Sequence, residues 1–238
     1  MKVIHEEENI SAEIKEAKRG FYIDFEGTMK HPPSILGVYS YDEYRSKENF
    51  TQYVIEQALW PMTEYVPEES HGYRPVNTES ITETLTNIRQ ACISEDRKIF
   101  AFGSHEIKEI KKLMAEANEK DDFDWWKENL INIQPLARKW VLDNKQLIEF
   151  EKLWKKYPED GKFTLVNFKR FFDHDVPVNL AKGKPAKAIG EMRKMLNDKN
   201  GDISKLTSTK KRNWTRMLRH NWHDCQSTRL LNIECARS

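Results

Sequence analysis

Residues 20–27, which read GFYIDFEG, decide the fold predicted for this chain. Apolar side chains surround two acids there, a pattern typical of a central strand covered by helices on both faces. Because side chains alternate along a strand, Asp24 and Glu26 point to the same face. Two acids at such a place need cations nearby, and together they could bind a metal ion. The alternative is that both acids lie at a strand end and face water.

A second strand is predicted at residues 98–102 (KIFAF), and a helix follows it directly. After Gly103 and Ser104, the segment HEIKEIKKLMAEAN carries apolar residues at helical spacing. Glu106 therefore falls in the first turn of a helix that follows a strand. An acid is also favoured at that position by the helix dipole and by capping, so Glu106 alone does not indicate a site.

Residues 207–234 are predicted to form one long helix with a stripe of inward-facing residues. The stripe consists of Trp214, Met217, Leu218, Asn221, Cys225 and Leu231. His220 and Asp224 are one turn apart, so their side chains project from one face. Asp224 could bind a metal ion there while His220 reaches a metal-activated water. The alternative is a solvated or capped pair.

Taken in order, these three motifs resemble those of the DEDD exonuclease superfamily, which has the ribonuclease H-like fold. The most similar branch comprises predicted ribonuclease H-like domains with motifs of the type FDIE, Y-x-S-x-E and Y-N-x-x-D-V. The corresponding segments here read YIDFEG, FGSHEIKEI and HNWHDCQ. The resemblance runs from about residue 20 to the end of the chain, although only the three motifs are specific and the long middle matches in layout alone.

The resemblance implies a 3′ to 5′ exonuclease that hydrolyses phosphodiester bonds of DNA or RNA, acting on single strands or 3′ ends. Two Mg²⁺ or Mn²⁺ ions would orient the attacking water and stabilise the leaving oxygen. In this scheme Asp24 bridges both ions, and Glu26 and Asp224 bind the ion that activates water. Glu106 binds the second ion through water, and His220 is the general base.

Two departures from the family pattern leave alternatives open. Glu106 stands where the second motif usually has an aspartate, and its side chain is one methylene longer. His220 has the spacing of the tyrosine subclass rather than that of the histidine subclass, so His105 is an alternative base. These departures motivate a second hypothesis, in which the chain is a catalytically degenerate ribonuclease H-like module that binds nucleic acid or acts as a scaffold.

The net charge of +1 conceals a basic segment just before the third motif. Between residues 181 and 220 there are twelve Lys or Arg residues and three acids, a composition that could follow a phosphate backbone. We expect the substrate to be bound by Lys210, Lys211, Arg212 and Arg216, and Trp214 and Trp222 could stack on bases. The alternative is a solvated surface balanced by nearby acids, such as those in the run 121–124 (DDFD).

Composition sets broader limits on the class of protein. With 238 residues, 38% of them hydrophobic, the chain can bury one sizeable core, so a single domain is expected at 20–238 after a charged helix or extension at 1–19. Its three cysteines form no C-x-x-C pair, which argues against a zinc site and a disulfide scaffold. No signal peptide, membrane span, P-loop, G-x-S-x-G or G-x-G-x-x-G motif is present. We therefore expect a soluble cytoplasmic protein with no membrane partner that hydrolyses its substrate with water.

The predicted fold class is α/β, a ribonuclease H-like mixed sheet flanked by helices, with a predominantly helical C-terminal half. Strands are predicted at 21–25, 35–41, 51–55, 98–102 and 131–133, and a loop at 60–78. Besides the segments already described, helices are predicted at 79–94, 136–157, 165–173 and 185–197.

Overall fold

The structure is a computed structural model that describes residues 11–28, 31–42, 45–65, 76–116, 120–158, 160–174 and 185–237. A six-stranded mixed sheet forms its centre, in the order β4-β3-β2-β1-β5-β6. The strands are β1 Phe21–Glu26, β2 Ile35–Asp42, β3 Lys47–Val54, β4 Val76–Thr78, β5 Ile99–Ala101 and β6 Leu130–Asn132. The first three strands form an antiparallel meander, and β5 pairs parallel with β1 and with β6. The predicted α/β class is confirmed.

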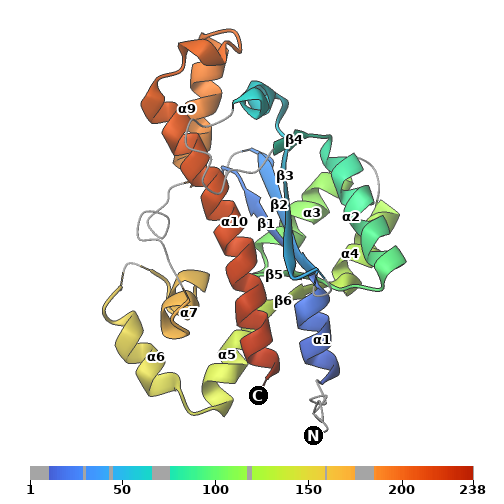
Figure 1. Ribbon diagram of the computed structural model, residues 1–238, viewed down its shortest axis with the longest axis vertical. Coiled ribbons are helices and arrows are strands. Elements are labelled where there is room, and N and C mark those ends of the chain that lie inside the picture. Colours follow the sequence, from blue (N-terminus) through green and yellow to red (C-terminus); the bar gives the residue numbers. More distant parts are fainter. Residues whose placement is uncertain are drawn as a thin grey trace, which may run out of the picture.

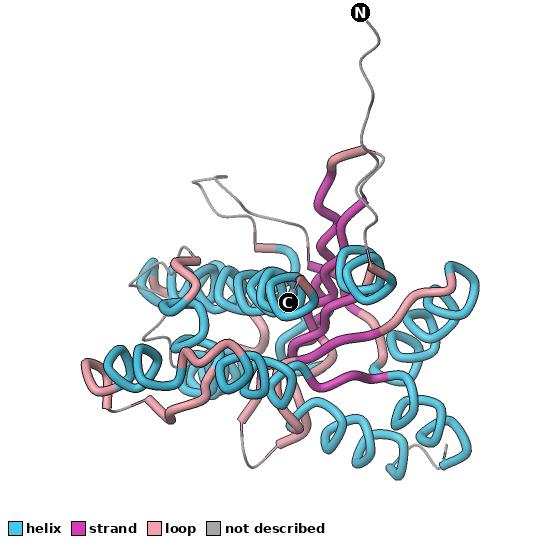
Figure 2. The backbone as a smooth tube through the Cα atoms, turned by 90° about the horizontal axis from the view of Figure 1, so that it is seen from below, coloured by secondary structure: helices cyan, strands magenta, loops and turns pink. Residues whose placement is uncertain are grey.

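Helices lie on both sides of this sheet (Figures 1 and 2). They are α1 Ala12–Arg19, α2 Ile81–Glu95, α3 His105–Glu116, α4 Lys120–Asn129, α5 Ile133–Asp143, α6 Leu147–Trp154, α7 Leu165–Phe171, α9 Pro185–Asp198 and α10 Ser208–Ala236. Short 3₁₀ helices are η1 Gln57–Glu64 and η2 Ile203–Lys205. The C-terminal half is mainly helical, as the sequence predicts.

The two faces of β1 enter different apolar clusters. Ile23 and Phe25 are buried with residues of α2, α3 and α4, whereas Tyr22 packs with residues of α5, α7 and α10. The strand is thus covered on both faces, as predicted. Because side chains alternate, Asp24 and Glu26 share the face of Tyr22 and are directed toward α10.

Helix α10 runs along this face of the sheet (Figure 1). Its predicted inward stripe is buried at every position. The exposed fractions lie between 0% for Asn221 and Cys225 and 4% for Leu218, and Trp214 is 2% exposed. The prediction that Trp214 stacks on nucleic-acid bases is therefore wrong, because its ring belongs to the apolar cluster shared by η1, α9 and the first half of α10. An ion pair between Arg193 of α9 and Glu56, which also accepts from the Ser34 hydroxyl, ties α9 to the sheet.

Most predicted elements are confirmed within a few residues, two predictions are wrong in part, and one helix, α4, was not predicted. Within the loop expected at 60–78, residues 60–64 belong to η1 and residues 76–78 form β4, whereas residues 66–75 lie outside the described part. The single helix expected at 136–157 is two helices, α5 and α6, because Lys145 adopts φ 56°, in the left-handed region that ends a helix. Of the helix expected at 1–19, residues 12–19 are helical and residues 1–10 lie outside the described part.

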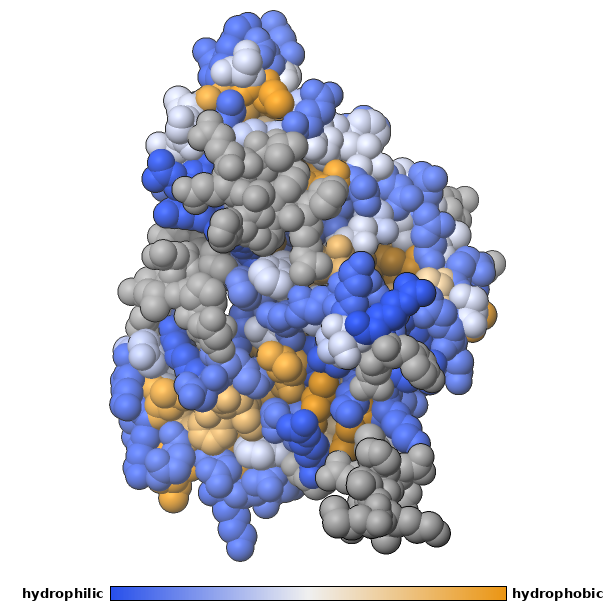
Figure 3. Space-filling model, in the orientation of Figure 1, coloured by the Kyte–Doolittle hydropathy of each residue, from blue (hydrophilic) through white to orange (hydrophobic). Residues whose placement is uncertain are grey.

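None of the helices in the described part of the chain combines the length and the apolar character needed to span a bilayer. On the face drawn in Figure 3 hydrophilic residues predominate, with hydrophobic patches mainly in the lower half. Leu142 of α5 and Ile148 of α6 are among the exposed apolar side chains.

A glycine in the middle of β2 determines how closely α10 approaches the sheet. Gly37 lies opposite Asp24 of β1 on one side and opposite Gln52 of β3 on the other. A Cβ atom at Gly37 would lie 2.2 Å from Oδ1 of Asn221. The absence of a side chain at this position therefore admits Asn221 to the sheet surface.

We expect Gly37→Ala to lower the free energy of unfolding by about 1–3 kcal/mol, because the added methyl group forces Asn221 and α10 away from the sheet. Urea denaturation followed by circular dichroism measures this. Gly190→Ala in α9 is the matched control, because its Cβ meets nothing within 4 Å; it should stabilise the helix by about 0.5–1 kcal/mol. Equal effects of the two substitutions would contradict this account of the close approach.

Candidate functional site

The site begins at the C-terminal end of β1, where two carboxylates face α10. The amide nitrogen of Asn221 donates to the backbone oxygen of Asp24 at 2.9 Å and to its Oδ2 at 2.8 Å. The amide oxygen of Asn221 accepts a bond of 2.8 Å from Gln52, which also donates to the carbonyl of Leu218. Both the nitrogen and the oxygen of the Asn221 amide therefore have hydrogen-bond partners, and the Asp24 carboxylate is held in one position.

His220 and Asp224 project from α10 beside these acids, on one face as predicted. Nε2 of His220 lies 3.7 Å from Oε1 of Glu26 and 3.6 Å from Oδ2 of Asp224. Both distances exceed an ordinary hydrogen bond, so the imidazole lies between two carboxylates without being locked to either. Its side chain is 19% exposed, which leaves it within reach of solvent.

Glu106 approaches from the other side of β1, in the first turn of α3. The turn between β5 and α3 passes through Gly103, whose φ of +107° suits glycine, and the Gly103 N–H donates to Asn132 Oδ1 at 2.9 Å. Glu106 is 4% exposed, and its Oε2 atom has no hydrogen-bond partner among the described residues. A buried carboxylate oxygen without a donor is costly to the fold and calls for a functional explanation.

The four acids are close enough to act on one another electrostatically. Burial raises the pKa of Asp24 well above its usual range, and the charges of Asp224 and Glu106 raise it further. Burial and the charges of Asp24, Asp224 and Glu106 do the same to the pKa of Glu26. The pKa of Glu106 is raised to about 7, mainly by burial. Such shifts are typical of sites that bind cations or transfer protons.

A lysine that the sequence analysis did not consider completes the cluster. Lys169 of α7 places Nζ at 2.7 Å from Oδ1 of Asp224, and its side chain is only 7% exposed. Its charge also lowers the pKa of Asp24, against the larger effect of burial. The site therefore contains one buried ammonium group among its carboxylates.

The structure brings together Asp24, Glu26, Glu106, His220 and Asp224, the five residues that the sequence singled out. As these side chains stand, no three of the His, Cys, Asp or Glu residues in the described ranges are arranged to hold a metal ion. Two of the acids, Asp24 and Asp224, already use their oxygens for contacts within the protein. Asn221 binds one oxygen of Asp24, and the two oxygens of Asp224 face Lys169 and His220.

His105, the alternative base, faces away from this cluster. It is 61% exposed, and its Nδ1 lies 3.7 Å from Oε1 of Glu109. The geometry therefore favours His220 over His105 as a group that can act on a water molecule near Asp24.

The four basic residues expected to bind substrate lie in the first half of α10, but two of them have protein partners. Lys210 forms an ion pair with Glu191 of α9, and Nζ of Lys211 lies 5.6 Å from the ring centre of Tyr65. Arg212 and Arg216 are exposed. Since Arg216 is one turn from His220, its guanidinium group continues the line of the site along α10.

Acids balance part of the basic segment. Glu191 pairs with both Lys187 and Lys210. Glu56 pairs with Arg193, and Asp202 pairs with Lys205. The side chains of residues 121 and 122 in the DDFD run lie outside the described part, and Asp124 is exposed on α4.

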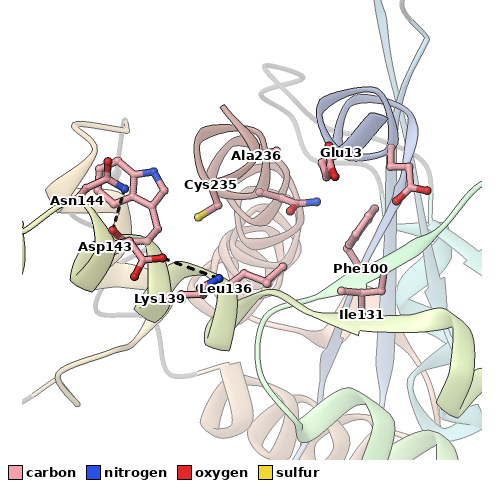
Figure 4. A pocket seen from close by; sticks show the side chains of 12 residues that line it. Glu13, Phe100, Ile131, Leu136, Lys139, Asp143, Asn144, Cys235 and Ala236 are labelled. Atoms are coloured by element: carbon pink, nitrogen blue, oxygen red, sulfur yellow. Dashed lines mark hydrogen bonds and ion pairs between the residues drawn. The ribbon is translucent and has the colours of Figure 1, made fainter. Parts of the chain in front are cut away.

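A separate cavity of about 420 Å³ lies between α1, α5 and the end of α10 (Figure 4). Phe100, Trp140 and Cys235 are among its lining residues, and none of the four carboxylates of the site lines it. Cys235 is eleven residues beyond Asp224 on the same helix, which corresponds to about 16 Å along the axis. This cavity is therefore distinct from the acidic cluster.

Sequence reasoning missed three residues that shape the site: Lys169, Gln52 and Gly37. A glycine inside a strand pattern often marks a close backbone approach, so Gly37 carried a usable signal. The polar Asn221 within the apolar stripe was a second signal, because a buried amide must find partners. Lys169 has no such signal in the sequence, since its partner is 55 residues away.

Comparison with protein-family models, with curated proteins and with solved structures found no match to this chain. The resemblance to the DEDD superfamily therefore rests on the three motifs.

The raised pKa of Glu106 predicts how stability changes with pH. In the unfolded chain the carboxyl ionises near 4.5, whereas in the folded protein it keeps its proton up to about 7. The folded state thus binds more protons between these values, and the free energy of unfolding should fall on the order of 3 kcal/mol as pH rises through this window. Asp24 and Glu26 act with the same sign.

Urea denaturation of the chelated protein at pH 4.5 to 7.5 measures this effect. In Glu106→Gln the free energy of unfolding should fall less between pH 4.5 and 7.5. At pH 7 this variant should be more stable than the original protein, because the substitution removes a buried charge. Glu149→Gln in α6, where the side chain is 61% exposed, is the control. An unchanged pH profile in Glu106→Gln would show that Glu106 is not the titrating group.

Proposed function

We propose that this protein is a metal-dependent phosphodiesterase that removes nucleotides from the 3′ end of DNA or RNA. The observation that carries the proposal is the buried Oε2 atom of Glu106. It has no donor among the residues that the structure describes, and the charge of Glu106 acts on Asp24 and Glu26. Four buried or half-buried carboxylates that repel one another destabilise the fold unless a cation joins them. A divalent cation is the ligand that best fits this arrangement.

The donor set suits Mg²⁺ or Mn²⁺, because these hard cations prefer carboxylate oxygens and water. The metal ligands would come from Asp24, Glu26, Glu106 and Asp224. When bound, it supplies the positive charge that activates a water molecule and neutralises the phosphate in the transition state. Cys225 lies beside the four acids, and burial together with their charges raises the pKa of its thiol well above its usual range. Its sulfur contacts the carbonyl of Gly37 at 3.6 Å, so a thiolate ligand is not supported.

The chain's own residues have distinct tasks in this proposal. His220 lies between Glu26 and Asp224 and is the best placed group to accept a proton from the attacking water. Asn221 holds Asp24 in position through two hydrogen bonds. Arg212 and Arg216 are exposed on the same helix and would bind phosphates upstream of the cleaved bond.

Asp24→Asn should reduce metal-dependent hydrolysis by roughly two orders of magnitude or more, because the carboxylate shared by the site is lost while the side-chain shape remains. End-labelled single-stranded DNA and RNA, incubated with Mn²⁺, Mg²⁺ or EDTA, would show the products on a gel. We expect a ladder from the 3′ end that requires metal. Asp143→Asn, at an aspartate that is 62% exposed on α5, should retain the original activity.

A second candidate is a catalytically degenerate module that binds nucleic acid without cleaving it. It is motivated by the engagement of Asp224 with Lys169 and His220, and by the lack of three ligands arranged for a metal in the described ranges. The same assay separates the two candidates. Intact substrate in every lane, with a folded protein that retains binding after Asp24→Asn, would favour the second.

The double substitution Arg212→Gln with Arg216→Gln should weaken single-strand binding for all sequences alike. Each lost phosphate contact should reduce the slope of log affinity against log salt by about 0.7. Fluorescence anisotropy with a labelled oligonucleotide at several salt concentrations measures this slope. Lys139→Gln with Lys152→Gln removes the same charge from exposed positions on α5 and α6, and it should leave the slope unchanged.

A further inference from the structure

We propose that Lys169 is a built-in cation of the acidic site, which takes the place of a second metal ion at Asp224 so that the chain binds one divalent ion rather than two. This inference rests on the proposed function, and it departs from the two-ion scheme that the family resemblance implies. It concerns a residue that belongs to none of the three motifs.

The contact itself is close and protected from solvent. Nζ of Lys169 lies 2.7 Å from Oδ1 of Asp224, and the exposed fractions of the two side chains are 7% and 20%. An ammonium group at this distance makes a charge-assisted hydrogen bond and occupies the space in which a metal ion would bind the same oxygen. A metal ion could reach Oδ1 only through its second lone pair, where the neighbouring ammonium charge would repel it.

Displacement is unfavourable because the lysine is anchored. Its neighbours in α7, Asn167 and Phe168, are 0% exposed, and the Lys169 carbonyl accepts from the N–H of His174 at 2.9 Å. Helix α7 packs against α10, and only 7% of the Lys169 side chain is exposed, so the ion pair is largely shielded from water. Removing one partner of a buried ion pair leaves the other charge uncompensated, which is strongly destabilising.

The other acids of the site are Asp24, Glu26 and Glu106. Asp24 has one oxygen bound to Asn221, and Glu106 has the bare Oε2 atom. Asp24, Glu26 and Glu106 are therefore the acids left to hold a single ion, whereas Asp224 is committed to Lys169 and faces His220.

Lys169 would also supply part of the charge stabilisation that a second ion would give during hydrolysis. A fixed ammonium group can stabilise the negative charge that develops on the phosphate and on the leaving oxygen, since a positive charge held in a dry site needs no reorganisation. It cannot activate water as a metal does. The water-activating task stays with the one ion and with His220.

Titration of the full chain with Mn²⁺ tests the inference, by calorimetry for the number of ions and by electron paramagnetic resonance for spin coupling between them. We expect one ion on the original protein and no coupled pair. Lys169→Met and Lys169→Gln remove the charge, so each should bind a second ion. The affinity for this second ion should be at least about tenfold higher than any affinity of the original protein for a second ion. Lys169→Arg keeps the charge and should again bind one.

Thermal unfolding supplies a readout that does not depend on catalysis. Lys169→Met should melt at a lower temperature than the original protein in EDTA, because Asp224 loses its partner, and Mn²⁺ should raise its melting temperature more than that of the original. Lys162→Met is the matched control, because Lys162 is ion-paired with Glu151 outside the site. This variant should bind one ion and respond to Mn²⁺ as the original does.

Two ions on the original protein would overturn the inference, and so would a single ion on both Lys169→Met and Lys169→Gln. If Lys169→Met does not fold, the original protein and Lys169→Gln still decide the question. Two ions together with metal-dependent cleavage would leave the proposed function intact, whereas one bound ion without cleavage of any end would refute the function but not the role of Lys169. Absence of any bound ion would refute both.

Discussion

The close packing of the Asn221 amide against Gly37 is the constraint on which the rest of the structure depends. Across β1, β2 and β3, the residues Asp24, Gly37 and Gln52 lie side by side, and the amide of Asn221 joins the outer two across the glycine between them. This contact sets both the depth and the rotation of α10 against the sheet. Since His220 precedes Asn221 and Asp224 follows three residues later, the same contact decides where the candidate catalytic groups lie.

Gathering four acids in this place works against the fold, and apolar packing elsewhere compensates. Separate clusters cover the two faces of β1, and a third joins η1, α9 and the first half of α10. Lys169 offsets one negative charge, whereas Oε2 of Glu106 has no donor within the described part of the chain. Local instability that is supported by the surrounding structure is the pattern expected where a protein gives up stability for a functional site.

Strong local patterns made much of the fold predictable. Alternation in β1, a strand-to-helix junction before Glu106 and the inward stripe of α10 each arise within one segment, so neighbouring residues suffice to recognise them. The break at Lys145 was missed because apolar spacing continues through it, and the left-handed backbone is carried by a residue other than glycine. The first part of the expected loop forms η1 because Leu59 and Met62 are buried in a cluster assembled from distant segments.

By itself the sequence determined the α/β class, the pairing of Asp24 with Glu26 on one face, the place of Glu106 at a helix start and the spacing of His220 and Asp224. Each depends on backbone periodicity, which is a local property. Only the tertiary structure decided that these residues meet, that Lys169 joins them, and that Gln52 and Gly37 hold α10 in register. Those contacts join residues far apart in the chain, and burial then determines their charge interactions, which no local pattern encodes.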